Sequence, residues 1–228
     1  LCCLQGHPES GKIYECHINQ IHGSKELNFK ATVNDRCIYQ TTYKGQQILL
    51  LKQVNDLAIA TNNESFAKEI YDIIGKKLQL PGESDLPFTY LGLINDYNGV
   101  DVDQRKEYIE VNACSYIERV ITSHGWNDSV KSLTPEKPFA PMPEDSVSKV
   151  FITTHNTIEG SAAHEDLEKK MGFSYRCLLG ELMYAYVTCR PDIGYAICYL
   201  SKFSTCPSEL HFNCLKGVAI YLKRTKHW

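Results

Sequence analysis

The sequence predicts an α+β fold in which antiparallel hairpins and helices come first and helices alone come last. Two observations support this prediction. Short runs rich in β-branched and aromatic residues flank tight-turn signals at Lys44-Gly45 and Asn98-Gly99. From residue 175 onward, apolar residues instead recur at helical spacing. Because strands and helices do not alternate as βαβ units, the strands are expected to pair in an antiparallel sheet.

The first hairpins are predicted in the N-terminal quarter of the chain. A helix over 11–30 is expected first, and strands over 37–43 and 47–54 follow it. Asn55-Asp56 then interrupts the apolar residues before a further apolar run at 57–60. This arrangement predicts a second tight hairpin centred on Asn55-Asp56.

A helix is predicted next, with Asn62 or Asn63 suited to cap its start and Leu80-Pro81-Gly82 suited to end it. Beyond it the patterns predict, in order, a strand over 89–94, a returning strand over 108–111 after the second turn, and a helix that ends at Gly125.

The stretch 127–166 is polar and punctuated by prolines, which predicts a connector or flexible linker. Three helices are expected after it, over about 175–189, 191–203 and 208–226. Pro191 and Pro207 suit the first positions of the last two helices.

Composition limits the class of protein. A length of 228 residues with 43% apolar content suffices for one large domain or two small ones, and 22% charged residues argue against disorder. We find no apolar run of about 20 residues and no signal peptide, so a membrane partner is not expected and an intracellular protein is. The lack of an initiator Met suggests part of a longer chain. The net charge of −3 argues weakly against a nucleic-acid partner.

The ten cysteines do not resemble a zinc or disulfide framework, because no two form a CxxC pair. Their spacing within apolar segments favours small buried hydrophobic residues in a reducing compartment.

The pair Asn55-Asp56 is the first candidate site. Nucleotidyl transfer by two divalent metals needs several carboxylates that converge, and a tight hairpin can hold them at a rigid tip. Asp56 offers the hard anionic oxygen that Mg²⁺ prefers, whereas Asn55 offers only a neutral carbonyl oxygen. Considered alone, an Asn-Asp pair in a hairpin is more often simple turn chemistry.

Two further segments are candidates. Residues 4–12 (LQGHPESGK) form a glycine-rich turn before a helix, which can present backbone N–H groups to phosphates. They fail the P-loop pattern because Ile13 stands where a hydroxyl is needed, so an ordinary helix start is the simpler interpretation. Arg190-Pro191-Asp192 indicates a helix start with an early acidic residue.

Six segments follow one another in a distinctive order: 4–12 (LQGHPESGK), 50–60 (LLKQVNDLAIA), 88–93 (FTYLGL), 175–184 (YRCLLGELMY), 190–196 (RPDIGYA) and 221–226 (YLKRTK). Together they resemble the reverse transcriptase domain of copia-type LTR retrotransposons. Segment 50–60 resembles the family hairpin that normally carries Tyr-Val-Asp-Asp, and segment 4–12 resembles its turn-and-helix motif.

The resemblance implies a polymerase palm-like antiparallel sheet with helices, followed by a thumb- and connection-like helical region. The implied domains are a partial palm over 1–100, a thumb-like β–helix unit over 101–127, a linker over 128–166 and a helical connection over 167–228. The family's ribonuclease H domain would begin after the last residue, and the first of its three carboxylates would lie upstream of residue 4.

The resemblance also implies site residues. Asp56 would be the surviving catalytic carboxylate and metal ligand, and Asn55 a degenerate one. The residues implied to touch template and nucleotide are Gln5, Gly6, Ser10 and Lys12. The family binds an RNA or DNA template-primer and dNTPs and uses Mg²⁺ or Mn²⁺. Loss of a charge at Asn55 and of an upstream carboxylate implies weak or absent metal binding here.

Three hypotheses remain open. The chain is a degenerate reverse transcriptase fragment without polymerase activity, or part of a longer, active polyprotein that supplies the missing carboxylate. Alternatively, it is a non-catalytic nucleic-acid-binding module. Its surface would then include the thumb-like helix over 112–125 and the basic residues Lys216, Lys223, Arg224 and Lys226.

Overall fold

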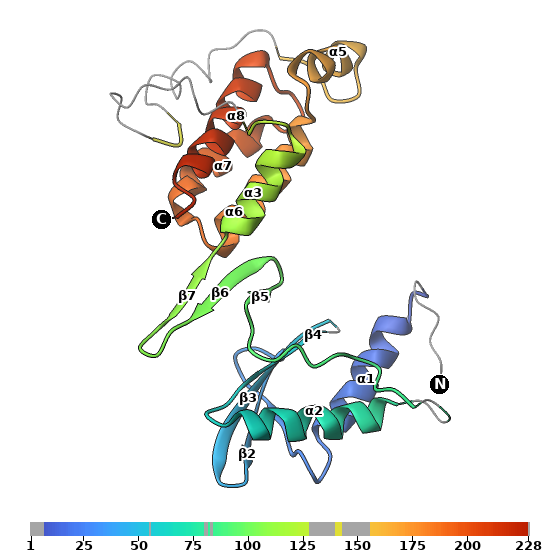
Figure 1. The fold of residues 1–228 in the computed structure, drawn as a ribbon. Helices are drawn as coiled ribbons and strands as arrows, with labels where there is room; N and C mark the ends of the chain where they lie inside the picture. Colours follow the sequence, from blue (N-terminus) through green and yellow to red (C-terminus); the bar gives the residue numbers. More distant parts are fainter. Residues whose placement is uncertain are drawn as a thin grey trace. The chain divides into compact units, whose positions relative to one another are not determined.

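The computed structural model describes residues 7–54, 56–79, 82, 84–127, 140–142 and 156–227 (Figure 1). Over these residues it contains two antiparallel sheets and seven α-helices, which confirms a mixed α and β chain. The chain divides into two compact units, Leu1–Ile94 and Asn95–Trp228, each described here by itself. The domain limits implied by the resemblance stay a prediction.

The first unit is a four-stranded antiparallel sheet in the order β1-β2-β3-β4, accompanied by two helices. Its elements are α1 (Ser10–His22), β1 (Lys30–Ala31), β2 (Ile38–Tyr43), β3 (Gln46–Gln53), β4 (Asp56–Ala60) and α2 (Glu64–Leu78). The predicted turn between β2 and β3 is confirmed, since Lys44 and Gly45 both have positive φ, 48° and 83°. Asn63 caps α2 by accepting a hydrogen bond from the backbone N–H of Ser65 at 3.0 Å.

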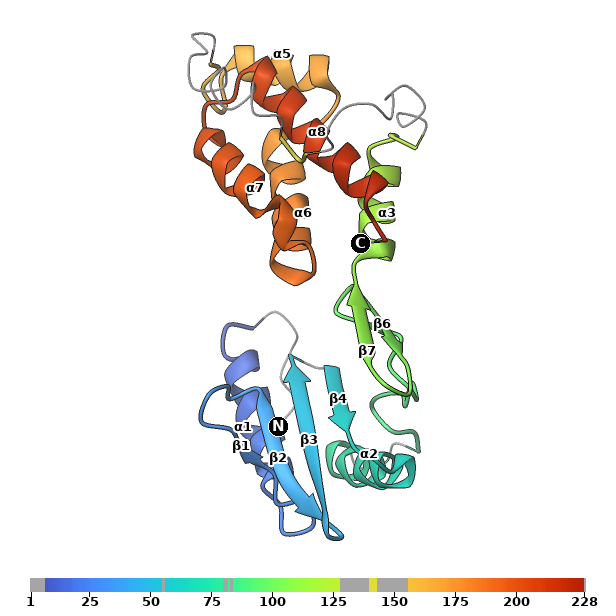
Figure 2. The same ribbon diagram turned by 90° about the vertical axis from the view of Figure 1, so that its left-hand side faces the viewer.

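Both helices of the first unit pack on one face of this sheet. Tyr39, Ile48 and Leu50 alternate with exposed neighbours along β2 and β3 and are almost fully buried. They form a core with Ile18 of α1 and Ile70 of α2, so α1 and α2 cover the same face (Figures 1 and 2). Within the described residues of this unit, no helix packs on the opposite face, which we call the open face.

Two expectations for residues up to 100 need correction. The helix predicted over 11–30 ends at His22. The strand predicted over 89–94 does not form: Gly92 adopts φ +76°, which breaks an extended backbone, and Leu91 is 88% exposed. The predicted Asn98-Gly99 turn is present.

The second unit begins with a small antiparallel sheet in the order β5-β6-β7 and continues with helices. Its elements are β5 (Asp96–Tyr97), β6 (Val100–Gln104), β7 (Ile109–Asn112), α3 (Cys114–Ser123), α5 (Ala162–Met171), α6 (Tyr175–Thr188), η1 (Pro191–Ile193), α7 (Gly194–Leu200), η2 (Ser201–Phe203) and α8 (Glu209–Arg224). The three tail helices confirm the prediction. Pro207, however, precedes the N-cap Ser208 and does not occupy the first helical position.

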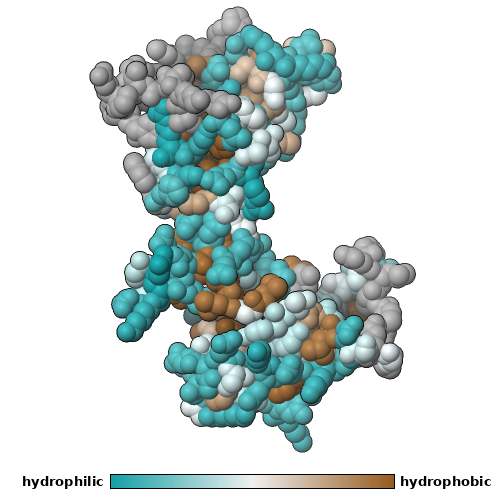
Figure 3. All heavy atoms as spheres, in the orientation of Figure 1, coloured by the Kyte–Doolittle hydropathy of each residue, from teal (hydrophilic) through white to brown (hydrophobic). Residues whose placement is uncertain are grey.

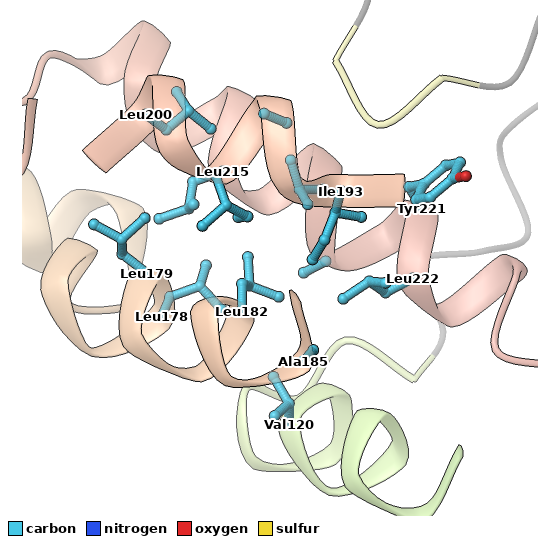
Figure 4. Packing of buried hydrophobic residues seen from close by; sticks show 14 of the residues in the cluster. Val120, Leu178, Leu179, Leu182, Ala185, Ile193, Leu200, Leu215, Tyr221 and Leu222 are labelled. Atoms are coloured by element: carbon cyan, nitrogen blue, oxygen red, sulfur yellow. The ribbon is translucent and has the colours of Figure 1, made fainter. Parts of the chain in front are cut away.

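A single apolar core joins the helices of the second unit. Leu178 and Leu182 of α6 face Leu215 and Leu222 of α8, and Val120 of α3 closes one side (Figure 4). Burial of each such side chain contributes roughly 1.5–3 kcal/mol relative to exposure. Packing of the apolar faces, more than local helix propensity, therefore holds this unit together.

The cysteine prediction is wrong for the described residues. None of the eight cysteines there is fully buried, and Cys16, Cys37, Cys177 and Cys198 are exposed. Cys16, Cys177 and Cys198 lie on exposed positions of their helices, whereas Cys189 and Cys214 are partly buried against the core of the second unit.

No helix in the described part of the chain is long and apolar enough to cross a membrane. Figure 3 shows hydrophilic residues over most of one face, with apolar residues gathered in separate patches.

His22 is a buried imidazole at the end of α1. Its side chain is fully buried, with its ring centroid 4.8 Å from that of Tyr39. Among the described residues, neither ring nitrogen has a hydrogen-bond partner. Burial, together with the nearby Lys52 cation, lowers the pKa of His22 to about 4.

We predict that acid destabilises the first unit through His22. A lowered pKa means that the folded state favours the neutral imidazole. The resulting contribution to the free energy of unfolding is fully present above pH 6.5 and decreases by about 3 kcal/mol as the pH falls towards 4. Urea unfolding of the wild type and of His22→Leu, followed at several pH values, measures this. The variant should lose that part of the pH dependence; equal slopes for both proteins would contradict the prediction.

We predict a steric penalty at Gly194. A Cβ there would lie 2.5 Å from Cε2 of Tyr186, so Gly194→Ala should lower the free energy of unfolding by about 1–3 kcal/mol. Gly180→Ala is the matched control, because its added Cβ would meet no described atom within 4 Å beyond the adjacent residues and the nearby backbone of its own helix. This substitution should stabilise the protein by about 0.5–1 kcal/mol. Similar thermal midpoints for the two variants would refute the clash.

Candidate functional site

The β3–β4 hairpin is displaced by one residue from its predicted centre. Gln53 pairs with Asp56, so Val54 occupies the turn and Asp56 is the first residue of β4. Asn55 lies outside the described residues. Val54 has φ +55°, which a β-branched side chain rarely adopts, and is 73% exposed. The prediction had centred the turn on Asn55-Asp56, because sequence alone does not set the strand register.

The strand register places Asp56 on the open face of the sheet. Residues opposite one another across antiparallel strands point to the same face, so Asp56 and Gln53 share it. Further rows on that face are Ala58, Leu51 and Ile38, then Ala60, Leu49, Gln40 and Lys30, then Gln47 and Thr42. The open face thus runs from one carboxylate, across small and apolar side chains, to a polar end.

An ion pair between the buried Lys52 and the half-exposed Glu15 lies on the covered face of the sheet. The Lys52 side chain is 4% exposed, and its Nζ donates to Oε2 of Glu15 on α1. Burial acts to lower the pKa of Lys52, but the Glu15 partner outweighs it, so that pKa is raised and the pKa of Glu15 is lowered. Tyr39 donates to Asn19 Oδ1 at 2.6 Å beside them.

This ion pair escaped the sequence analysis, although one signal was present. Lys52 stands two residues after Leu50 and four after Ile48, which are both buried, so period-two alternation places it inward. Tyr14 lies close enough to feel the charges of Lys52, Glu15 and Asp56, and burial raises its pKa.

The predicted template- and nucleotide-binding residues are only partly placed. Gln5 and Gly6 lie outside the described residues. Ser10 begins α1 and is half-buried, and Lys12 is exposed on the first turn. Within the described ranges, no hydrogen bond or ion pair joins Ser10 or Lys12 to Asp56.

The donor set on this face does not fit a pair of divalent metals. Asp56 is the one carboxylate of the described hairpin residues, and no group of three His, Cys, Asp or Glu side chains converges anywhere in the described ranges. Two-metal chemistry needs several anionic oxygens that bridge and position both ions. The described residues of the hairpin therefore do not form a two-metal site.

Much of the basic cluster expected to bind nucleic acid is engaged within the second unit. Lys216 lies 5.1 Å from the ring centroid of Trp126, and Lys223 donates to the carbonyl of Trp126 at 3.2 Å. Lys226 pairs with Glu118. These contacts tie α8 to α3 and the residues after it, which gives the lysines a structural role.

The predicted helix start at Pro191 with an early acidic residue is confirmed, and the same segment also forms a clasp, which is the network of hydrogen bonds among Arg190, Asp192, Tyr221 and Thr225. The buried Arg190 donates to both carboxylate oxygens of Asp192, at 2.9 and 2.6 Å, and to the hydroxyl of Thr225 at 2.6 Å. Tyr221 donates to Asp192 at 2.9 Å. Burial alone would raise the pKa of Asp192, but these hydrogen bonds outweigh it and hold that pKa below its ordinary value.

The sequence of this chain is similar to those of three plant transposon polyproteins. The chain is 22% identical over 88% of its length to the retrovirus-related Pol polyprotein from transposon TNT 1-94 of Nicotiana tabacum. It is 25% and 24% identical over 87% of its length to those from transposons RE1 and RE2 of Arabidopsis thaliana. The chain is a distant relative of plant transposon Pol polyproteins.

The relationship is remote and partial. The chain spans 14% of the length of the TNT 1-94 polyprotein and 12% of each Arabidopsis polyprotein. No family model matches it, and no solved structure matches it. Similarity to a Pol polyprotein therefore extends along most of this chain, while the palm-like arrangement has no structural neighbour to support it.

We predict that the clasp is essential to the second unit. Asp192→Ala leaves a buried guanidinium without its carboxylate and should lower the free energy of unfolding by about 3–5 kcal/mol. The control is Asp166→Ala, which removes an exposed pair with Lys169 and should cost under about 1 kcal/mol. Urea denaturation measures the free energy of unfolding of both variants. Equal decreases for the two variants would show that the clasp stabilises the unit no more than an exposed ion pair does. Because the pKa of Asp192 is lowered, its contribution should fade at acidic pH.

Proposed function

We propose that this chain is the reverse transcriptase part of a copia-type retrotransposon Pol polyprotein and does not synthesise DNA by itself. The observation that carries the proposal is the β3–β4 hairpin, which presents Asp56 on the open face of an antiparallel sheet backed by two helices. Similarity to Pol polyproteins over 87–88% of the chain supports it, as do the six sequence segments and their order.

Inactivity follows from charge. A metal-dependent nucleotidyltransferase neutralises developing negative charge with ions held by carboxylates, and loss of one well-placed electrostatic group costs about 10²–10³ in rate. Asn55 is neutral where the resemblance implies a carboxylate. In this proposal template-primer and dNTP are the ancestral partners, binding of Mg²⁺ or Mn²⁺ at Asp56 is weak or absent, and the protein acts inside the cell.

Nucleic-acid binding without catalysis is a second candidate. One observation favours it: the open face of the sheet presents a strip of side chains that no helix in the described part of the first unit covers. This face, and not the internally paired lysines of α8, is the surface that we assign to such binding. Membership in a longer, active polyprotein remains a third hypothesis, which Asn55→Asp in a longer chain would test by raising activity.

We predict no metal-dependent primer extension by the purified chain on a poly(rA)·oligo(dT) substrate, with either Mg²⁺ or Mn²⁺, because its hairpin carries Asn55 beside Asp56. An active reverse transcriptase in the same assay and a cooperative thermal transition of the chain are the controls. Extension that requires metal and disappears in Asp56→Ala would overturn the proposal.

A further inference from the structure

A polar hollow lies at the end of the open sheet face that is remote from the hairpin. Its volume is about 340 Å³, and it is lined by Asn28, Lys30, Gln40, Thr41, Thr42 and Gln47. The register explains this grouping, because Lys30 lies opposite Gln40 and Thr42 opposite Gln47. From Gln53, opposite Asp56, to Gln47 is six residues along β3, or roughly 20 Å. The hollow is thus separate from the hairpin.

The lining has an unusual balance of charge and hydrogen-bonding groups. Three carboxamides supply both donors and acceptors, and Lys30 supplies the only charge, since no carboxylate lines the hollow. Nearby lysines are neutralised: Lys44 pairs with Glu69, Lys52 with Glu15 and Lys77 with Glu26. In the described residues Lys30 has no ion-pair partner. An unneutralised ammonium among amide groups selects an anionic ligand.

The carboxamides decide which anion suits the hollow. A bare phosphate would use the ammonium and amide N–H groups but would face the carboxamide oxygens unfavourably. A nucleoside phosphate instead offers N–H and O–H donors on its base and sugar, and Asn and Gln pair with base edges through two hydrogen bonds. The volume falls at the small end of ligand sites, which span about 300–1,000 Å³.

We infer that the hollow binds one nucleoside monophosphate unit, with Lys30 on the phosphate and Gln40 and Gln47 on the base or sugar. The choice of a nucleotide over another phosphate ester rests on the proposed function. The inference that the ligand is an anion rests on Lys30 alone and is independent of that function. The unit comes either from a free nucleotide or from one position of a strand lying along the open face. Both sources share the same phosphate and nucleoside chemistry.

Titration of the ¹⁵N-labelled full chain with AMP tests this inference. Backbone amide shifts should centre on Lys30, Gln40 and Gln47, and Lys30→Gln should weaken binding about tenfold by removing a charge-assisted hydrogen bond. Gln47→Leu should also weaken AMP binding while leaving the phosphate interaction in place. Lys76→Gln is the matched control, because it removes the same charge from α2, on the covered side of the sheet. The affinity of this variant for AMP should stay within twofold of that of the wild type.

Two further titrations identify the ligand. Tighter binding of an rA hexamer than of AMP, with the same shifts, supports the site and assigns a strand, whereas equal binding supports the site and assigns a free nucleotide. Inorganic phosphate that binds as well as AMP, adenosine that binds as well as AMP, or shifts that avoid the hollow would each overturn the inference. Primer extension is read separately, so AMP binding by a polymerising chain would refute the proposed function alone.

Discussion

The strand residues of the candidate site take their direction from the packing of both helices of the first unit on one face of the β1–β4 sheet. Side chains of adjacent residues in a strand point to opposite faces, so burial of Ile48 and Leu50 against α1 and α2 settles the direction of each neighbour. Asp56, Gln40 and Gln47 are thereby directed to the open face. The helices pack on the other face of the sheet, yet they determine where these residues point.

The electrostatics of the two faces differ for the same reason. On the covered face the buried ammonium of Lys52 is held by the half-exposed Glu15. Burial, and secondarily the nearby Lys52 cation, lowers the pKa of His22 and favours its neutral form. On the open face Asp56 and Lys30 are exposed to solvent at opposite ends. A ligand on the open face would therefore meet a negative group at one end and a positive group at the other.

Local signals in the sequence predicted much of the fold. The Lys44-Gly45 and Asn98-Gly99 turns and the three tail helices were predictable because backbone conformation there depends on the residues themselves. The hairpin register was not, since it depends on which face α1 and α2 cover. The strand over 89–94 failed because a strand needs a partner, which sequence patterns do not reveal. Lys30, Gln40 and Gln47 are distant in sequence and become neighbours only through strand pairing.

The buried side chain of Lys52, paired with Glu15, has a consequence for how the strands of the first unit find their native register. If β3 slipped by one residue against its neighbours, Lys52 would turn to solvent, Glu15 would lose its counter-ion, and Gln53 and Leu51 would replace Lys52 and Leu50 beneath α1. An apolar residue at position 52 would tolerate such a slip more readily. The ion pair adds little net stability on general grounds, but its loss in a slipped register makes mispaired strands less favourable than the native pairing.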